Sequence, residues 1–390
     1  MQAHEIRGIE LSQKELARYA RHLTLPEIGL TGQKQLKASS VLCIGSGGLG
    51  SAVLLYLAAA GVGRIGIVDS DLVEDSNLQR QVLHGMKWLA KPKTASARAR
   101  ILEINPYCQV DTFQTLLTKN NALEVIKNYD LVCDCTDNFP SRYLINDACV
   151  ILRKPNIHGS IARFEGQATV FNLNENSPNY RDLIPDPPPP GLLPSCAEGG
   201  VIGVLPGLIG VIQATEAIKI ITGIGKPLCG RLLIFDALSM TFKELSLKPN
   251  IHREKIDKLI DYDEFCAGNS SDQSKVEALS IANISARQLH EKLENDQKNI
   301  LLLDVRNPEE YDLGSIKGAT SMPLHSIESG EAIEIIRGMI RTRQLYIYCK
   351  SGKRSIKALI KLKHHQINGI NVSGGIDAWN SEILTKLSSS

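Results

Sequence analysis

A cysteine opens a short basic segment near the C-terminal end of the sequence, Cys349-Lys-Ser-Gly-Lys-Arg354-Ser355. The apolar run before it, Leu345 to Tyr348, predicts a strand, and Ile356 to Ile360 after it predict the start of a helix. At such a turn the backbone N–H groups and the positive end of the helix favour the thiolate over the thiol. Two lysines and Arg354 add positive charge beside the sulfur. The segment therefore predicts a reactive cysteine rather than a structural one.

This segment resembles the active-site loop of rhodanese-type sulfurtransferases, Cys-x-x-Gly-x-Arg. Two further segments, Asp304-Val-Arg306-Asn-Pro-Glu-Glu-Tyr311 and Gly374-Gly-Ile-Asp-Ala-Trp379, match the other signatures of that family, so the resemblance covers about the last hundred residues. It implies that Cys349 carries sulfur as a persulfide and that Arg354 belongs to the catalytic loop. The related phosphatases have five residues between cysteine and arginine, whereas four stand here. The shorter loop favours sulfur over phosphate.

A second set of residues that could do chemistry lies near the other end of the sequence. Gly45-Ser-Gly47-Gly48-Leu-Gly50 follows a predicted strand, Ser40 to Ile44, and precedes a predicted helix. Glycines at this spacing let the backbone approach a phosphate, and the helix N-terminus favours the anion. Asp69 ends the next predicted strand, where an acid accepts hydrogen bonds from ribose hydroxyls. Taken alone, this pattern also fits a dinucleotide-dependent dehydrogenase.

The residues that follow favour a nucleoside triphosphate. Ser76-Asn77-Leu78-Gln79-Arg80 places a guanidinium just beyond the ribose acid, and Lys93 comes soon after it. Asp137-Asn138 follows another predicted strand. Arg80 and Lys93 can neutralise a triphosphate, and Asp137 can hold Mg²⁺ through its oxygens. Hydride transfer needs none of these groups, whereas attack on an α-phosphate needs them all.

From about residue 11 to residue 247 the sequence resembles the adenylating enzymes of the MoeB/ThiF and ubiquitin-activating family. Besides the glycine turn, the resemblance rests on five segments: Arg18-Tyr-Ala-Arg21-His, Ser76 to Gln81, Lys93, Thr136-Asp-Asn138 and Pro194-Ser-Cys196-Ala-Glu-Gly-Gly200. It implies that the following residues contact ATP, with Asp137 on the Mg²⁺ side: Gly48, Asp69, Ser76, Asn77, Leu78, Gln79, Arg80, Lys93, Asp137 and Asn138. It also implies that Arg21 reaches the phosphates of a neighbouring subunit, hence a homodimer, and that Cys196 takes part in the thiol step.

Resemblance at both ends of one chain indicates a fused adenylyltransferase and sulfurtransferase of the MoeZ type. Such an enzyme adenylates the C-terminal glycine of a ubiquitin-fold sulfur carrier with a Gly-Gly tail, here of the molybdopterin-synthase type. Sulfur from a cysteine desulfurase or from thiosulfate then yields a thiocarboxylate. The same chemistry on a thiamine-branch or tRNA-thiolation carrier stays open. A non-catalytic scaffold would require the loss of Arg80, Lys93, Asp137 or Cys349, and all four are present.

One departure from this family concerns metal. Relatives commonly hold a structural zinc with two Cys-x-x-Cys pairs. Here Asn179 and Asp182 stand where the first pair would be, and the region from Lys248 to Glu254, where the second would be, has no cysteine. Four thiolates are a typical zinc cage. We therefore expect no zinc site.

The elements that position these residues alternate between strand and helix, which predicts an α/β fold. We expect a doubly wound Rossmann-like adenylating domain over 1–247, a linker over 248–275 and a smaller α/β rhodanese domain over 276–390. Residues 181–190, rich in proline, are expected to form an irregular surface crossover. The apolar run from Val201 to Ile212 looks too short to span a membrane and is expected to be a buried turn and helix.

Composition narrows the class of protein further. The chain has 390 residues and a net charge of +2, so length predicts two or three domains and charge gives no case for nucleic acid or an anionic membrane as partner. Nine cysteines without a Cys-x-x-Cys pair indicate a reducing compartment. The first residues show no targeting pattern, so we expect a cytoplasmic protein, or one of an organelle stroma if the organelle encodes it.

Overall fold

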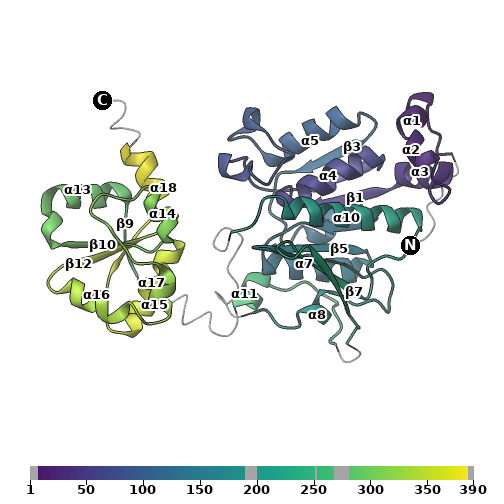
Figure 1. The fold of residues 1–390 in the computed structure, drawn as a ribbon. Coiled ribbons are helices and arrows are strands. Elements are labelled where there is room, and N and C mark those ends of the chain that lie inside the picture. Colours follow the sequence, from purple (N-terminus) through teal and green to yellow (C-terminus); the bar gives the residue numbers. More distant parts are fainter. Residues whose placement is uncertain (1–7, 189–199, 251–252, 268–280, 385–390) are drawn as a thin grey trace. The chain divides into compact units, whose positions relative to one another are not determined.

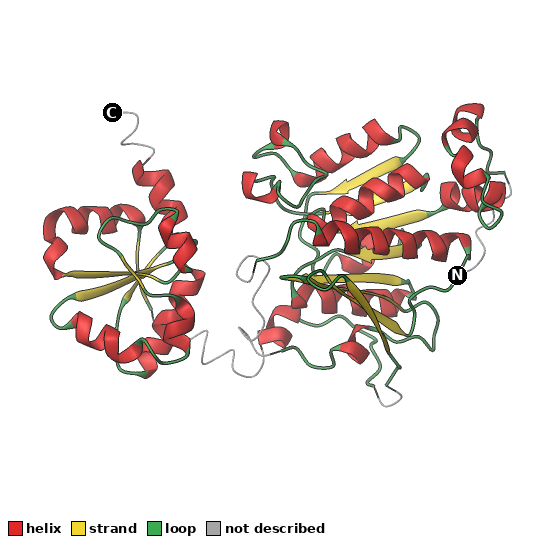
Figure 2. Ribbon diagram, viewed as in Figure 1, coloured by secondary structure: helices red, strands yellow, loops and turns green. Residues whose placement is uncertain are grey.

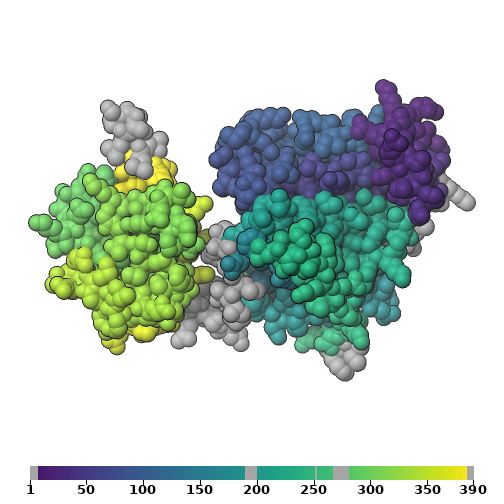
Figure 3. Space-filling model, viewed as in Figure 1, coloured from purple at the N-terminus to yellow at the C-terminus, as the bar shows by residue number. Residues whose placement is uncertain are grey.

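The structure is a computed structural model, and it describes residues 8–188, 200–250, 253–267 and 281–384 (Figure 1). The chain divides into two compact units, Met1–Gly268 and Asn269–Ser390, and each is described by itself. Figure 3 shows the first unit in purple to teal and the second in green to yellow. The division falls inside the predicted linker, 248–275. The first part of that segment belongs to the first unit, because Tyr262 is buried in its core.

The first unit is built on an eight-stranded sheet of order β3-β2-β1-β4-β5-β6-β7-β8. Its strands are β1 (Ser40–Ile44), β2 (Arg64–Val68), β3 (Gln109–Phe113), β4 (Leu131–Asp134), β5 (Asn156–Ala162), β6 (Glu165–Phe171), β7 (Arg231–Asp236) and β8 (Thr241–Ser246). The pairs from β3 to β5 are parallel, and those from β5 to β8 are antiparallel. The predicted α/β class with a Rossmann-like sheet is confirmed. Strand β6 was not predicted, and the sheet is parallel only in its first five strands.

Helices cover both faces of this sheet (Figure 2). They are α1 (Gln13–Arg18), α2 (Ala20–Leu23), α3 (Gly29–Ala38), α4 (Gly48–Ala60), α5 (Lys93–Ile104), α6 (Ala122–Ile126), α7 (Phe139–Leu152), α8 (Tyr180–Leu183), α10 (Leu205–Thr222) and α11 (Tyr262–Ala267), with 3₁₀ turns at Asp75–Asn77 and Met86–Trp88. Side chains of β1 alternate between the two buried clusters: Val41 and Cys43 face α4 and α10, whereas Leu42 and Ile44 face α7. This alternation is what sandwiches the sheet between two helical layers.

Helix α10 differs from the expectation for its segment. It continues from Leu205 to Thr222, so among the described residues it is the one helix long and apolar enough to cross a membrane. Its length therefore does not exclude a spanning helix, and that part of the sequence argument was wrong. However, 61% of the helix is buried, and it lies along α4 and over β5 and β6. The expected buried helix is the one that the structure shows.

The proline-rich crossover also departs from expectation at its start. Residues Tyr180–Leu183 form the one-turn helix α8, because Asn179 caps the turn and shares a capping box with Asp182. Residues 184–188 have no regular structure. The rest of the crossover, 189–199, lies outside the described residues.

The second unit contains a five-stranded parallel sheet of order β11-β10-β12-β13-β9. The strands are β9 (Ala282–Ile284), β10 (Ile300–Asp304), β11 (Thr320–Ser321), β12 (Gln344–Tyr348) and β13 (Ile370–Val372). The helices are α13 (Ala286–Asp296), α14 (Pro308–Asp312), α15 (Leu324–Glu328), α16 (Ile333–Ile340), α17 (Lys353–His364) and α18 (Gly375–Trp379), with a 3₁₀ turn at Gln297–Asn299 and a π turn at Asn380–Leu384. Buried clusters on both faces of this sheet hold the helices.

Candidate active sites

A cavity of about 360 Å³ lies at the carboxyl ends of β1, β2 and β4 in the first unit. The chain runs from β1 outward to β2 on one side, while β4 flanks β1 on the other, so strand order reverses here. Open α/β sheets bind ligands at such a switch point. Eight of the predicted site residues line the cavity: Gly45, Gly47, Gly48, Asp69, Arg80, Lys93, Asp137 and Asn138.

The glycine turn requires glycine at three of its positions, and at Gly48 the reason is that a Cβ would lie 2.8 Å from Pro206 Cβ. Gly45 has φ of +91°, and a Cβ there would come within 2.9 Å of the Cys135 carbonyl oxygen. A Cβ on Gly50 would lie 2.1 Å from the Gly45 oxygen. Helix α4 begins at Gly48, so its N-terminus opens onto the cavity. A phosphate here would meet backbone amides and the positive end of the helix.

The acid that ends β2 is held in a fixed orientation. Asp69 Oδ2 accepts hydrogen bonds from Ser46 N and Ser46 Oγ, both at 2.8 Å, and Oδ1 accepts one from Asp71 N at 2.9 Å. An ionised carboxylate can accept about four hydrogen bonds. Asp69 therefore keeps capacity for one ribose hydroxyl while its other bonds stay in place.

The two predicted cations are supported by neighbours of different kinds. Lys93 begins α5, and its Nζ lies 2.8 Å from Asp71 Oδ2, with the lysine side chain buried and the aspartate side chain exposed. Arg80 Nη1 donates to the Ser76 carbonyl oxygen at 3.1 Å. Asp71 was missed in the sequence, although its spacing of two residues from Asp69 is a signal that could have found it. Its contact holds the Lys93 side chain in place at the cavity wall.

Asp134, at the end of β4, accepts the hydrogen bonds that hold the turn carrying Asp137. Asp134 Oδ1 accepts from Thr136 N at 3.0 Å and Thr136 Oγ1 at 2.7 Å, and Oδ2 accepts from His158 Nδ1 at 3.2 Å. Burial alone would raise the pKa of Asp134, but the bond from His158 holds it below its ordinary value. Burial lowers the pKa of His158, so this ring is neutral and donates. Asp137 itself is exposed to the cavity, where its oxygens fit a Mg²⁺ ligand.

Other predicted residues lie away from the cavity lining. Asn77 is buried and its Oδ1 accepts from Glu74 N at 3.2 Å, which is a turn-capping role. Ser76, Leu78 and Gln79 do not line the cavity, and their contact with ATP stays a prediction. Arg21 is exposed on α2 and does not line the cavity of its own chain. Besides Asp71, sequence reasoning gave no role to the following lining residues with polar side chains: Ser70, Gln81, Thr115, Thr136, Ser141 and Arg142.

The second site is the turn between β12 and α17 in the second unit. Cys349 follows β12 and is 1% exposed, and its Sγ accepts a hydrogen bond from Gly352 N at 3.1 Å. Gly352 has φ of +97°, the left-handed conformation that bends the loop around the sulfur. Helix α17 begins at Lys353, three residues earlier than expected. The sulfur thus faces a backbone amide at a helix start, as predicted.

A hydrogen-bonded chain leads away from this sulfur. Ser355 Oγ lies 3.5 Å from Cys349 Sγ and 2.7 Å from Asn371 Oδ1. Asn371 Nδ2 donates in turn to Asn283 Oδ1 at 2.7 Å, so the orientation of both amides is fixed. Arg354 points elsewhere, since its guanidinium binds Glu310. Sequence reasoning gave no role to Ser355, Asn371 or Glu310. For Asn371 and Glu310 the reason is that their partners lie 16 or more positions away in the chain.

Comparison with known proteins agrees with the families predicted for the two units. Residues 19–255 match the ThiF family model, and residues 285–382 match the rhodanese-like domain model. The chain belongs to the ThiF family. It is 46% identical over 379 residues to a probable adenylyltransferase/sulfurtransferase MoeZ of Mycobacterium tuberculosis, covering 96% of this chain and 95% of that protein. It is 40% identical to the adenylyltransferase and sulfurtransferase MOCS3 of Drosophila yakuba, covering 96% of this chain and 85% of that protein.

A crystal structure of E. coli MccB with ATP shares the fold, with a TM-score of 0.54 and 20% identity over 64% of this chain and 76% of that one. These findings confirm the predicted fusion of a ThiF-type unit with a rhodanese-like domain. They show an enzyme with adenylyltransferase and sulfurtransferase activity. The adenylyltransferase family implies ATP as nucleotide, and the adenylyltransferase/sulfurtransferase relatives imply a sulfur carrier as partner.

The place where ThiF relatives were expected to hold zinc contains a polar clasp, formed by Asp182 and Arg253. The side chain of Asp182 is buried; its Oδ2 accepts from Asn179 N at 2.8 Å and from Arg253, and its Oδ1 accepts from Asn250 N at 2.8 Å. The same arginine donates to the Ser177 carbonyl oxygen. Within the described ranges no group of three metal-ligating side chains occurs. These donors and acceptors satisfy one another and do not fit a zinc cage. The clasp instead ties the start of the crossover to the segment around Arg253.

Two further thiols, Cys196 and Cys266, lie outside the described residues or outside both candidate sites. Cys196 and its segment, Pro194 to Glu198, lie outside the described residues, so its role in the thiol step stays a prediction. Cys266, unassigned from the sequence, lies in α11, where burial raises the pKa of its thiol to about 11. It is therefore a poor nucleophile at neutral pH.

Proposed function

We propose that this enzyme adenylates the C-terminal glycine of a ubiquitin-fold sulfur carrier, of the molybdopterin-synthase small-subunit type, and converts it to a thiocarboxylate for molybdenum cofactor biosynthesis. The observation that carries the proposal is the presence, in one chain, of a cavity lined by a glycine turn and two cations and of a buried thiol that accepts a hydrogen bond from a backbone amide. Each group suits one half of the reaction, and neither suits hydride transfer.

In the first half, a carboxylate oxygen of the carrier attacks the α-phosphorus of ATP, and pyrophosphate leaves with the electrons of the broken P–O bond. Negative charge grows on the phosphate oxygens during this step. Arg80 and Lys93 on the cavity wall stabilise that charge, and the amides at the start of α4 hold the phosphates. Asp137 would hold Mg²⁺, which supplies further positive charge when bound.

In the second half, Cys349 carries a persulfide. Its terminal sulfur attacks the carbonyl carbon of the acyl-adenylate, and AMP leaves. The product is an acyl disulfide that joins the carrier to Cys349. The thiolate of Cys196 then attacks Cys349 Sγ, which releases the thiocarboxylate and leaves a disulfide between the two cysteines. An external thiol reduces this disulfide for the next cycle.

The chain's residues do not select the carrier. The same half-reactions apply to a thiamine-branch or tRNA-thiolation carrier, because each offers a C-terminal carboxylate to the same cavity. We propose a homodimer in which Arg21, exposed on α2, contacts the phosphates of the nucleotide bound by the partner subunit. We also propose a cytoplasmic location, or an organelle stroma if the organelle encodes the protein.

The decisive experiment is intact-mass analysis of candidate carriers after incubation with the enzyme, ATP and a sulfur source. We expect one carrier to gain the mass of replacing a carboxyl oxygen by sulfur, only with ATP present. A matched reaction with Cys349→Ala should leave that carrier unchanged or adenylated. If no carrier gains sulfur and none supports pyrophosphate exchange, the proposal fails and a binding scaffold becomes the better account.

A further inference from the structure

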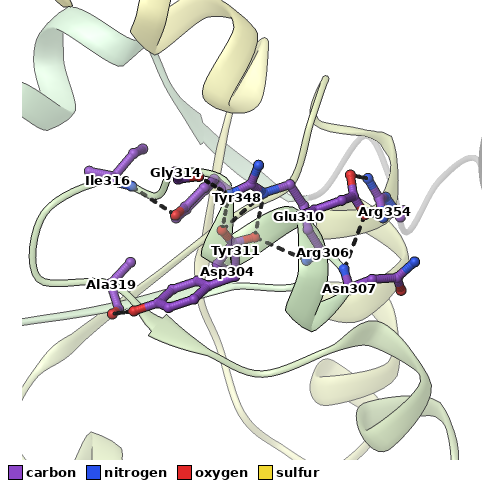
Figure 4. Close-up of polar contacts among 10 residues, drawn as sticks. All are labelled: Asp304, Arg306, Asn307, Glu310, Tyr311, Gly314, Ile316, Ala319, Tyr348 and Arg354. Carbon is purple, nitrogen blue, oxygen red and sulfur yellow. Dashed lines mark hydrogen bonds and ion pairs between the residues drawn. The ribbon is translucent and has the colours of Figure 1, made fainter.

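The arginine of the sulfur-transfer loop is already occupied by a carboxylate (Figure 4). Arg354 Nη1 lies 2.6 Å from Glu310 Oε2, and Nη2 lies 2.7 Å from Glu310 Oε1. This is a two-pronged pair between α17 and α14, which lie far apart in the sequence. Such parallel bonds are the strongest form of the arginine–carboxylate contact.

Glu310 is fixed in place independently of Arg354. It is the third residue of α14, and its Oε2 accepts from Asn307 N at 3.1 Å in a capping box. The side chains of the pair are 12% exposed for Arg354 and 31% for Glu310. The bonds from Arg354 hold the pKa of Glu310 below its ordinary value. The carboxylate is therefore ionised at neutral pH and neutralises the loop arginine.

The other arginine of this region is neutralised in the same way. Arg306 Nε donates to both oxygens of Asp304 at 3.0 Å, and Nη2 donates to Asp304 Oδ2 at 2.6 Å and to the Gly314 oxygen at 2.7 Å. Lys350 and Lys353 are exposed, where water screens their charge. A dianionic ligand could therefore bind either guanidinium only by breaking an existing ion pair.

The polar groups that the loop places at the sulfur suit a ligand with one negative charge. Cys349 Sγ already meets the amide of Gly352 and lies beside the hydroxyl of Ser355. A persulfide bears one negative charge on its terminal sulfur, whereas thiosulfate brings two. A second charge would have to be desolvated at a loop whose arginine is already paired with Glu310, which is unfavourable.

We propose that Glu310 determines donor specificity: by neutralising Arg354 it selects a persulfide carried on a thiol over dianionic thiosulfate. The proposal rests on the sulfur-carrying role of Cys349 given above. The Cys349 thiolate attacks the outer sulfur of the donor persulfide, the S–S bond of the donor breaks, and the donor thiolate leaves and takes a proton. Cys349 then bears the transferred sulfur, and no external oxidant or reductant is needed.

The test compares two donors, glutathione persulfide and thiosulfate, with cyanide as acceptor and thiocyanate as product. Glu310→Gln keeps the capping acceptor for Asn307 but removes the charge. Glu309→Gln removes the same charge from an exposed neighbour in the same helix and is the matched control. We expect the ratio of kcat/KM for thiosulfate to that for glutathione persulfide to rise at least about tenfold in E310Q and to stay within about twofold in E309Q. An unchanged or lower ratio in E310Q overturns the proposal.

A double variant identifies the route of the effect. Because the gain in E310Q is assigned to a released Arg354, it should vanish in E310Q/R354Q; a gain that persists there overturns the assignment. Urea midpoints of all variants establish that they fold. Loading of persulfide on Cys349 of the unaltered enzyme, followed by intact mass, tests the proposed function separately. Its absence with both donors would refute that function, whereas a flat donor ratio with normal loading refutes only the role of Glu310.

Discussion

Removal of the Asp182 carboxylate should destabilise the first unit by several times more than removal of an exposed carboxylate nearby. Asp182→Ala leaves Arg253 without its anion and leaves the amides of Asn179 and Asn250 without their acceptor. The change is informative because the clasp occupies the place where relatives are expected to hold a structural zinc.

The size of the effect follows from burial. The Asp182 side chain is 1% exposed, and breaking a buried ion pair by removing one partner costs about 3–5 kcal/mol. Arg253 is 29% exposed, so part of its charge regains water and the cost falls. Orphaned amides add back about 1 kcal/mol each where they stay buried. We expect a loss of about 2–4 kcal/mol in the free energy of unfolding.

The assay is urea unfolding followed by the fluorescence of Trp88, in a Trp379→Phe background so that the signal reports the first unit. The matched control is Glu175→Gln, which breaks the Arg153–Glu175 pair at 82% and 81% exposure and should cost less than about 0.5 kcal/mol. A chelator should not change the midpoint of the unaltered protein, and elemental analysis should find less than one zinc per chain. A loss below about 1 kcal/mol in D182A, or a midpoint that falls with chelator, would refute the reasoning.

Four further outcomes are expected. Arg80→Met should lower carrier-dependent ATP–pyrophosphate exchange at least about 100-fold while thiocyanate formation at Cys349 stays normal, because only the first site loses charge stabilisation; equal exchange would contradict the cavity assignment. Cys349→Ala should keep exchange but lose the persulfide mass and donor-dependent transfer, and free bisulfide should partly restore product. Cys196→Ala should load persulfide normally yet release thiocarboxylate slowly or stay joined to the carrier, as seen by non-reducing mass analysis. The folded state binds a proton at His158 less readily than the unfolded state, whose pKa is near 6.5, so stability should fall as pH drops below about 6.5. His158→Gln should make this fall of the urea midpoint shallower, and an identical slope would refute the role of that ring.

Strands β1, β2, β4 and β7 could be predicted because each is a short apolar run that ends at, or just before, a glycine or an acid. Strand β6 could not. It begins with polar residues, and it follows β5 after a two-residue turn, Arg163-Phe164. Arg163 adopts φ of +52°, a conformation for which hairpin turns usually use asparagine or glycine. Pairing with β5 and β7 overrides the local signal, and only the folded sheet supplies those partners.

Some residues of the candidate sites could likewise be predicted from the sequence, and others could not. Residues at the carboxyl ends of parallel strands must meet at one edge of the sheet, so Asp69 and Asp137 could be placed together from the sequence. Residues that act through a distant partner could not. His158 lies 24 positions from Asp134, and Glu310 lies 44 positions from Arg354; both pairs exist only because separate elements dock. Asn77, in contrast, sits in a recognisable motif but caps a turn.

The apolar helix α10 has a consequence for how the chain is made. The elements it lies against, α3, α4, β5 and β6, all precede it in the sequence. At a synthesis rate of about 5–20 residues per second, the residues between the end of β6 and the start of α10 take roughly 2–7 s to produce, which is ample time for the earlier elements to fold. A nascent helix apolar enough to enter a membrane thus emerges beside a surface that is ready to cover it. Its route is set by the order of synthesis, and slowing the folding of the preceding sheet would lengthen the interval in which ribosome-bound chains expose it to membranes and to one another.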